Sequence, residues 1–192
     1  MNVVTPRRLL VVAAIVGSVV MTASGLAAAA AHVHTAQACR NAVIDATAPV
    51  ITRDDILIRA PRSTVWAIQT DVENWPDWQP GVTAVRRADA GKLRVGSAFT
   101  WDVEGLHVTS TVRQVEPGRR IVWGGTGNGI TAVHVWTFTP PRDGVLVHTE
   151  ESWQGAPVDA DVPTAQAALD ASLRAWLENL KQVSEAQTAP GR

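Results

Sequence analysis

The stretch GSAFTWDVEGLHVTSTVRQVEPGRRIVWGG, Gly96 to Gly125, alternates apolar and polar side chains along two successive segments. The first segment covers residues 97–104, and the second covers residues 106–116 after the turn sequence EGL. A period of two with one polar face predicts antiparallel strands whose other face is buried. The apolar positions of the first segment are Phe99, Trp101 and Val103.

Further strands are predicted on both sides of this stretch. A short strand at residues 55–61, DILIRAP, ends at a proline, because the residue before a proline is disfavoured in a helix. A helix follows with Val65, Trp66 and Ile68 on its inner side, and the prolines and glycine of residues 71–81 end it. The remaining predicted strands are residues 82–87, 120–125, 130–139 and 145–154.

The carboxy-terminal part changes to a helical period. From Pro163 onward one apolar stripe predicts a long amphipathic helix. Asp159 and Asp161 lie where acidic residues favour a helix amino terminus. We expect this helix to bury its stripe against the concave face of the sheet, the one large apolar surface available. The stripe consists of Leu169, Leu173, Trp176, Leu177 and Leu180.

This order of elements resembles the START-like superfamily, also called SRPBCC, and within it the polyketide cyclase/dehydrase and lipid-transport group. The resemblance covers about Ile51 to Val183. It implies an α+β helix-grip fold, in which a curved antiparallel sheet of about six to seven strands wraps around a long C-terminal helix and leaves a cavity between them. Its landmarks are the Val65-Trp66 pair, the segment Trp75 to Pro80, and the paired strands that end at Trp123 and Trp136.

The amino terminus has the features of an export segment. Arg7 and Arg8 precede an apolar run, residues 9–21, and a small-residue stretch, residues 22–31. This order is typical of a secretory signal peptide, but residues 9–31 are also long enough to cross a bilayer as an anchor. We therefore expect residues 1–31 to be a signal peptide or a membrane anchor. Either role places the domain outside the cytoplasm, secreted or tethered to the membrane.

The rest of the chain divides at changes in composition. We expect residues 32–50 to be a linker, residues 51–187 the START-like domain, and residues 188–192 a disordered tail. His32, His34 and Cys39 in the linker do not make up a four-ligand metal set, so no metal site is predicted. Cys39 is the only cysteine, which excludes an intramolecular disulfide.

Composition narrows the function classes. The 17 Lys and Arg residues are balanced by 18 Asp and Glu residues, so no basic field for nucleic acid exists. The chain has eight Trp and two Phe but no Tyr, which excludes a tyrosine proton donor. A small apolar molecule is the expected partner, membrane contact through the N-terminal segment is open, and the oligomeric state is not specified. No cofactor is predicted.

Indole rings on the inner sheet face suggest a ligand site, since each has a large apolar plate and one N–H group. The same rings could instead fill the core. Glu150 and Glu151 are adjacent and face opposite ways, so they are not a carboxylate pair, and no catalytic residue is assigned. The glycine-rich residues 124–129 are expected to be a loop with a hairpin turn at Asn128-Gly129. The predicted ligand-binding residues are Phe99, Trp101, Trp123, His134, Trp136 and Trp153, with Trp75 and Trp78 at the cavity rim.

Three functions fit these features. The first is an exported or membrane-anchored protein that binds or carries a small hydrophobic ligand, a lipid or a polycyclic molecule. The second is an enzyme that resembles a polyketide cyclase or aromatase and moves protons with a few polar residues of the cavity. The third is a protein-interaction module of the cell envelope, with Trp75 and Trp78 as an exposed aromatic patch.

Overall fold

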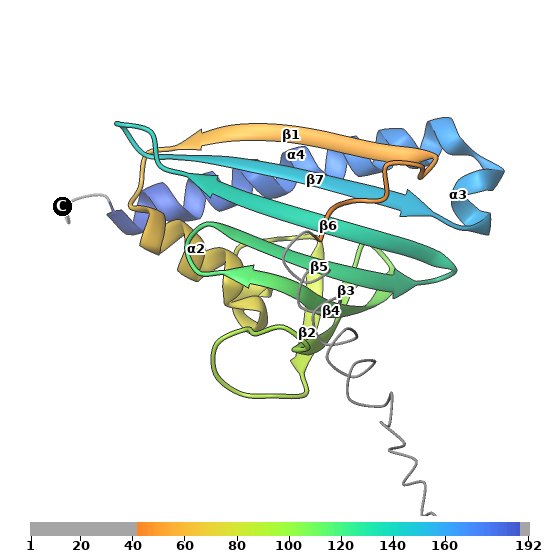
Figure 1. Ribbon diagram of the computed structural model, residues 1–192, viewed down its shortest axis with the longest axis horizontal. Coiled ribbons are helices and arrows are strands. Elements are labelled where there is room, and N and C mark those ends of the chain that lie inside the picture. Colours follow the sequence, from red (N-terminus) through yellow and green to blue (C-terminus); the bar gives the residue numbers. More distant parts are fainter. Residues whose placement is uncertain (1–41, 189–192) are drawn as a thin grey trace, which may run out of the picture. The chain divides into compact units, whose positions relative to one another are not determined.

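The computed structural model describes residues 42–188, which form one antiparallel sheet with helices packed against it (Figure 1). The strands are β1 (Val50–Ile58), β2 (Val82–Arg87), β3 (Ala98–Val103), β4 (Leu106–Glu116), β5 (Arg120–Gly127), β6 (Ile130–Thr139) and β7 (Val145–Gln154). The helices are α2 (Arg62–Thr70), the 3₁₀ helix η1 (Val72–Asp77), α3 (Ala156–Ala160) and α4 (Val162–Thr188). The strand order is β1-β7-β6-β5-β4-β3-β2, so strands β2 to β7 are a meander and β1 pairs with the last of them.

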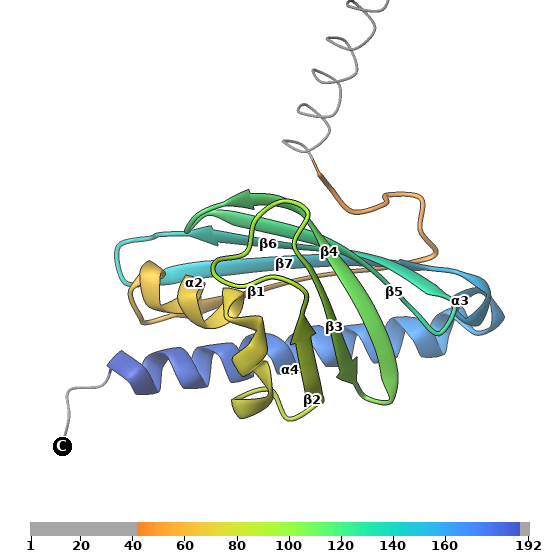
Figure 2. The same ribbon diagram turned by 90° about the horizontal axis from the view of Figure 1, so that it is seen from below.

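The sheet bends around α4, which lies across its concave face (Figure 2). The predicted apolar stripe of α4 is fully packed, with each of its five side chains at most 2% exposed. Burial of each such side chain contributes roughly 1.5–3 kcal/mol, so the stripe is a main source of stability. This arrangement confirms the predicted helix-grip fold, including the antiparallel sheet and the long C-terminal helix.

The first strand is longer than its sequence pattern indicated. It was expected at residues 55–61, but β1 begins at Val50 and pairs with β7 along its whole length, from Val50 opposite Trp153 to Ile58 opposite Val145. The polar residue Thr52 lies on the inner face because its hydroxyl donates to Asp170 of α4 at 2.6 Å. Because the partner of Thr52 is more than a hundred positions away in the sequence, the local alternation of apolar residues could not predict this part of β1.

The glycine-rich segment is also more regular than expected. Asn128 and Gly129 have φ angles of 50° and 83°, and they form the predicted tight turn between β5 and β6. The expected loop at residues 124–127 is wrong, because these residues continue β5 and pair with β6 up to Gly127 opposite Ile130. The glycines therefore belong to the sheet.

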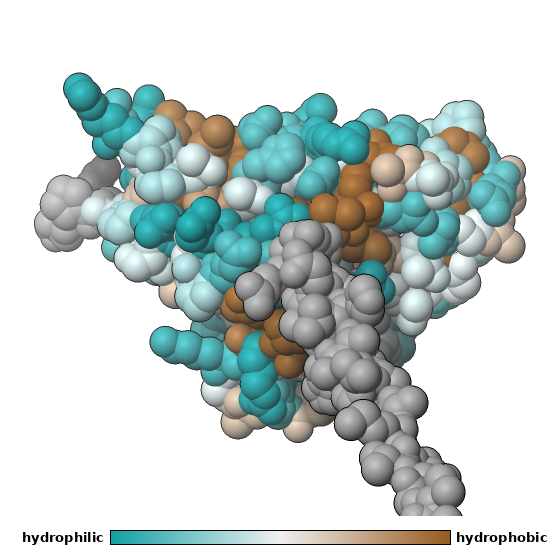
Figure 3. Space-filling view, viewed as in Figure 1, coloured by the Kyte–Doolittle hydropathy of each residue, from teal (hydrophilic) through white to brown (hydrophobic). Residues whose placement is uncertain are grey.

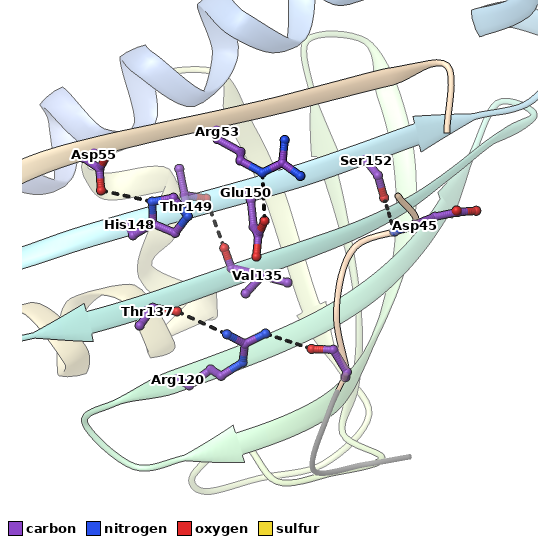
Figure 4. Close-up of polar contacts among 11 residues, drawn as sticks. Asp45, Arg53, Asp55, Arg120, Val135, Thr137, His148, Thr149, Glu150 and Ser152 are labelled. Carbon is purple, nitrogen blue, oxygen red and sulfur yellow. Dashed lines mark hydrogen bonds and ion pairs between the residues drawn. The ribbon is translucent and has the colours of Figure 1, made fainter. Parts of the chain in front are cut away.

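Residues 42–49 pack on the outer face of the sheet, although they fall within the expected linker. Ile44 is 7% exposed and lies against Val122, Val133 and Val135. The backbone N–H of Asp45 donates to Ser152 Oγ at 3.0 Å (Figure 4). An apolar contact and a hydrogen bond thus hold this segment against β5, β6 and β7.

Cross-strand polar pairs cover much of the remaining outer face. Arg53 pairs with Glu150 at 3.2 Å, and Asp55 pairs with His148 at 3.0 Å, both between β1 and β7 (Figure 4). Accordingly, this face is largely hydrophilic, with hydrophobic patches between the polar side chains (Figure 3). The outer face thus has the polar character that the alternating sequence predicts.

Several expectations lie outside residues 42–188. They concern the signal peptide or anchor at residues 1–31, the candidate ligands His32, His34 and Cys39, and residues 189–192 of the tail. Among the helices of the described part, none combines the length and apolar character that a membrane span requires.

Candidate functional site

Most of the space between the sheet and α4 is filled by aromatic rings. Trp75 lies at the centre of this cluster and is fully buried. Its ring centroid is 4.9 Å from that of Trp176 and 5.4 Å from that of Trp101, in edge-to-face contacts. Both Trp75 and Trp176 donate their indole N–H to Gln69 of α2, to its backbone and side-chain oxygens at 3.0 and 3.1 Å. The cluster therefore ties η1, α2 and α4 together.

These contacts correct the expectation for the rim. Trp75 does not border the cavity at all, because η1 turns its indole into the core. Trp78 is half-buried and packs edge-on against Trp176, with centroids 6.0 Å apart. The pair is not an exposed aromatic patch, which counts against the interaction-module hypothesis.

A cavity of about 70 Å³ remains between the sheet and the first half of α4. Three of the predicted ligand-binding residues line it: Trp101, His134 and Trp153. The other three, Phe99, Trp123 and Trp136, are at most 2% exposed and belong to the packed core. The remaining lining side chains are mainly Val, Leu and Ile of β3, β4, β6 and α4, with Glu104 and Ser172 near the solvent.

Glycines of β5 shape the floor of this cavity. Gly125 and Gly127 both line it, and they place no side chain on the inner face. A Cβ atom on Gly127 would lie 2.5 Å from the carbonyl oxygen of His107 on β4. The close approach of the two backbones therefore favours glycine at this position.

The polar wall of the cavity is a pair that sequence reasoning missed. His134 of β6 and Glu151 of β7 are direct cross-strand partners, and His134 Nδ1 lies 3.2 Å from Glu151 Oε2. Their side chains are only 4% and 13% exposed. The indole N–H of Trp153 donates to the other carboxyl oxygen, Oε1, at 2.9 Å. The side chains of His134, Glu151 and Trp153 thus lie together in the wall of the cavity.

The contacts of Thr149 fit a neutral His134 with its proton on Nε2. The Thr149 hydroxyl donates to the carbonyl oxygen of Val135 at 3.3 Å, so its oxygen is free to accept the Nε2–H of His134 at 2.8 Å. A neutral imidazole with its proton on Nε2 presents a lone pair at Nδ1. A protonated Glu151 facing this lone pair leaves both groups uncharged.

Burial favours the uncharged form of both Glu151 and His134. Loss of water contact raises the pKa of Glu151 to about 7 and lowers the pKa of His134 to about 3. A neutral carboxylic acid and a neutral imidazole avoid the cost of placing two charges among indole rings. The pair can donate and accept hydrogen bonds, and it can exchange one proton near neutral pH.

The register of the last hairpin could have revealed this pair. In the hairpin of β6 and β7 the residue numbers of each pair sum to 285, as in Thr139 with Leu146 beside the turn. Counting back from that turn places His134 opposite Glu151. No group of three or more His, Cys, Asp or Glu side chains suited to a metal occurs within residues 42–188.

Comparison with known proteins places this site in context. One relative, the oxopyrrolidines biosynthesis cluster protein O of Penicillium oxalicum, is 29% identical over 123 residues, which are 52% of this chain. The matched region spans 60% of the length of that protein.

Two solved structures show the same fold. The Zhui aromatase/cyclase of Streptomyces sp. R1128 has a TM-score of 0.65 at 16% identity, with 74% of this chain and 98% of that chain covered. A START superfamily protein of Mycobacterium smegmatis has a TM-score of 0.63 at 18% identity, with 72% and 99% covered. At these identities the likeness concerns the fold alone.

The family model for polyketide cyclase/dehydrase and lipid transport proteins matches residues 49–185, which include every strand from β1 to β7, nearly all of α4, and both His134 and Glu151. This chain therefore belongs to the polyketide cyclase/dehydrase and lipid transport family.

Proposed function

We propose that this domain binds a small, mainly apolar molecule that carries one uncharged hydrogen-bonding group. The observation that supports it is the Glu151–His134 pair in the wall of an otherwise apolar cavity under α4. Concave apolar sites with a few converging polar groups are the usual ligand sites of proteins. The ligand's polar group would meet Glu151 and His134, and its apolar part would contact Trp101 and Trp153.

The size of the cavity limits the ligand. A dry cavity of about 150 Å³ accommodates benzene, and the cavity beside Glu151 measures about 70 Å³. Neither a lipid, a polycyclic molecule nor a single aromatic ring therefore fits inside it as a whole. Because the half-exposed Ser172 and the exposed Glu104 also line the cavity, we propose that the leading end of a ligand enters here and its remainder stays at the opening.

Three compounds that share one benzene ring test this proposal: phenol, benzene and benzoate. We expect phenol to bind with a Kd on the order of 1 mM, and at least about fivefold more tightly than benzene, because one net hydrogen bond is worth about 1 kcal/mol. Benzoate should bind more weakly than both, since it would bring a charge beside a buried carboxyl group. The indole N–H signal of Trp153 in NMR spectra reports on binding.

Two matched variants of β6 locate the binding. Ala132 lines the cavity, whereas Thr131 lies on the opposite face of the same strand. Ala132→Phe should fill the cavity and abolish phenol binding, and Thr131→Phe should leave it unchanged. Equal phenol affinity in both variants, or no binding of any of the three probes to the wild-type protein, would show that the proposal is wrong.

A second candidate function is catalysis of proton transfer, and the buried pair supports it independently. A group whose pKa lies near 7 is suited to general acid–base catalysis at neutral pH, and the pKa of Glu151 is about 7. Exchange of the α-protons of cyclopentanone for deuterium is a suitable test. Glu151→Gln should slow the protein-dependent exchange by about 100-fold or more, and equal rates in both proteins would reject catalysis.

We also propose that residues 1–31 carry the domain out of the cytoplasm, either as a cleaved signal peptide or as a retained anchor. Support comes from the order of two arginines, an apolar run and a small-residue stretch. Cell fractionation combined with mass spectrometry of the mature amino terminus tests this. An intact chain in the cytoplasmic fraction would disprove export.

A further inference from the structure

A groove of about 920 Å³ runs along α2 and shares no lining residue with the cavity beside Glu151. One wall is the side of α2 that includes Arg62 and Trp66. The other walls are the end of β2 with the loop that follows it, and the turn between β4 and β5 at Gly118. Figure 2 shows α2 beside that loop. The groove is therefore a second, separate concavity of the domain.

Positive charge dominates the lining of the groove. Arg62, Arg87 and Lys92 line it together with one acid, Asp71. Arg87 already lies 3.1 Å from Asp89 and 3.9 Å from Glu73, so Arg62 and Lys92 are the cations that supply this charge. The Arg62 guanidinium lies over the β4–β5 turn, since a Cβ atom on Gly118 would be 3.6 Å from Arg62 Nε. Within residues 42–188, neither Arg62 nor Lys92 forms an ion pair.

Arg87 is the buried member of this set, with a side chain that is only 6% exposed. Its two terminal nitrogens donate to the Gly91 carbonyl oxygen at 2.6 Å and to Asp89 at 3.1 Å. Its Nε–H is buried and has no partner in the part of the chain that the structure describes. Because this Nε is buried and Asp89 and Glu73 lie beside the guanidinium, Arg87 shapes the wall of the groove, and the exposed Arg62 and Lys92 remain to contact an anion.

The start of α2 adds to this field. The helix begins at Arg62 without a side-chain cap and has no acidic residue in its first turn. Its first backbone N–H groups therefore retain their partial positive charge, which favours anions, phosphate in particular. Ser63, in the same turn, also lines the groove.

We propose that this groove binds a phosphate monoester that carries an apolar substituent. The two negative charges of the phosphate would lie near Arg62 and Lys92, the lining cations that form no ion pair within residues 42–188. The apolar substituent would lie on Trp66, Leu93 and Val115, which line the same groove. This site is independent of the function proposed for the cavity beside Glu151.

Octyl phosphate is the probe for this proposal, with octanoate and inorganic phosphate as comparisons. Isothermal titration should give octyl phosphate an affinity at least about tenfold higher than that of either comparison, since only octyl phosphate offers both the dianion and the apolar tail. The double variant Arg62→Gln/Lys92→Gln should weaken octyl phosphate binding by about tenfold or more. Arg174→Gln on the exposed side of α4 is the matched control and should change nothing.

The outcomes separate this groove from the cavity. Ala132→Phe, which blocks the cavity, should leave octyl phosphate binding intact, so failure of one proposal does not affect the other. The groove proposal is overturned if octanoate or inorganic phosphate binds as tightly as octyl phosphate. It is also overturned if the double variant binds octyl phosphate like the wild type, or if Ala132→Phe removes that binding.

Discussion

Replacing either member of the His134–Glu151 pair should create a pH-dependent stability that the pair does not produce in the wild-type protein. Burial lowers the pKa of His134 from 6.5 to about 3 and raises the pKa of Glu151 from 4.5 to about 7. Between pH 4.5 and 6.5 the unfolded chain therefore holds one proton on His134, and the folded chain holds one on Glu151. Because both states bind the same number of protons, the intact pair contributes no pH dependence in this window.

Each single substitution removes one of the two titrating groups, so the folded and unfolded states no longer bind the same number of protons. In Glu151→Gln the depressed pKa of His134 remains, so the free energy of unfolding falls as the pH falls below 6.5. In His134→Gln the raised pKa of Glu151 remains, so stability is complete below pH 4.5 and is lost as the pH rises toward 7. One proton corresponds to about 1.4 kcal/mol per pH unit. From pH 4.5 to 6.5 each variant should change by about 2 kcal/mol relative to wild type, in opposite directions, because the slope is reduced near the unfolded pKa values.

Urea unfolding followed by tryptophan fluorescence at pH 4.5, 5.5 and 6.5 measures these slopes. Subtracting the wild-type curve removes the contribution of the other carboxyl groups. Nitrogen NMR of the His134 ring at pH 5.5 adds a direct check, since a neutral imidazole with its proton on Nε2 is expected. Parallel stability curves for all three proteins, or an imidazolium signal at pH 5.5, would refute the assignment of the proton to Glu151.

Three further predictions concern the stability of the fold around the cavity, and urea unfolding measures each of them. Leu173→Ala should lower the free energy of unfolding by about 2–5 kcal/mol, because Leu173 is 1% exposed under the sheet; Arg174→Ala, one position along α4, should change it by less than about 0.5 kcal/mol. Gly127→Ala should cost about 1–3 kcal/mol, because its Cβ would meet a β4 backbone carbonyl at 2.5 Å; a neutral effect would contradict the close approach. Asp161→Ala should lower the free energy of unfolding, since its carboxylate accepts the backbone N–H of the third residue of α4 at 3.1 Å; Asp159→Ala, a nearby acid that does not cap α4, is the control and should have a smaller effect.

The architecture was predictable because each element has its own local period. The stripe from Leu169 to Leu180 has helical spacing, and the alternation of Phe99, Trp101 and Val103 indicates a strand with one buried face. All of these side chains are at most 9% exposed in the fold. The start of β1 was not predictable in this way, because Thr52 is buried by a hydrogen bond to Asp170 on a distant helix.

The candidate site was less accessible to sequence reasoning, because it depends on which strands are neighbours. Phe99, Trp123 and Trp136 share a face with cavity residues, but the ring of Trp75, supplied by η1, fills the space beside Phe99 and Trp123. No periodicity indicates that a short 3₁₀ helix inserts its indole there. Likewise, the alternating pattern of β7 alone does not identify Glu151 as a site residue. The register of the hairpin is needed, because it places Glu151 opposite His134.

The two proposed sites differ in polarity for one physical reason, which is the position of their cations. Inside the sheet, the lining of the cavity includes no Lys or Arg, so Glu151 is not stabilised as an anion and takes up a proton instead. Along α2, the exposed Arg62 and Lys92 line an open groove where water supports their charges, and the buried Arg87 is paired with Asp89. A neutral hydrogen-bonding ligand is therefore matched to the cavity, whereas a charged ligand is matched to the groove. A phosphate in the cavity would lose its hydration without gaining a cation, and a phenol in the groove would gain little from the cations there.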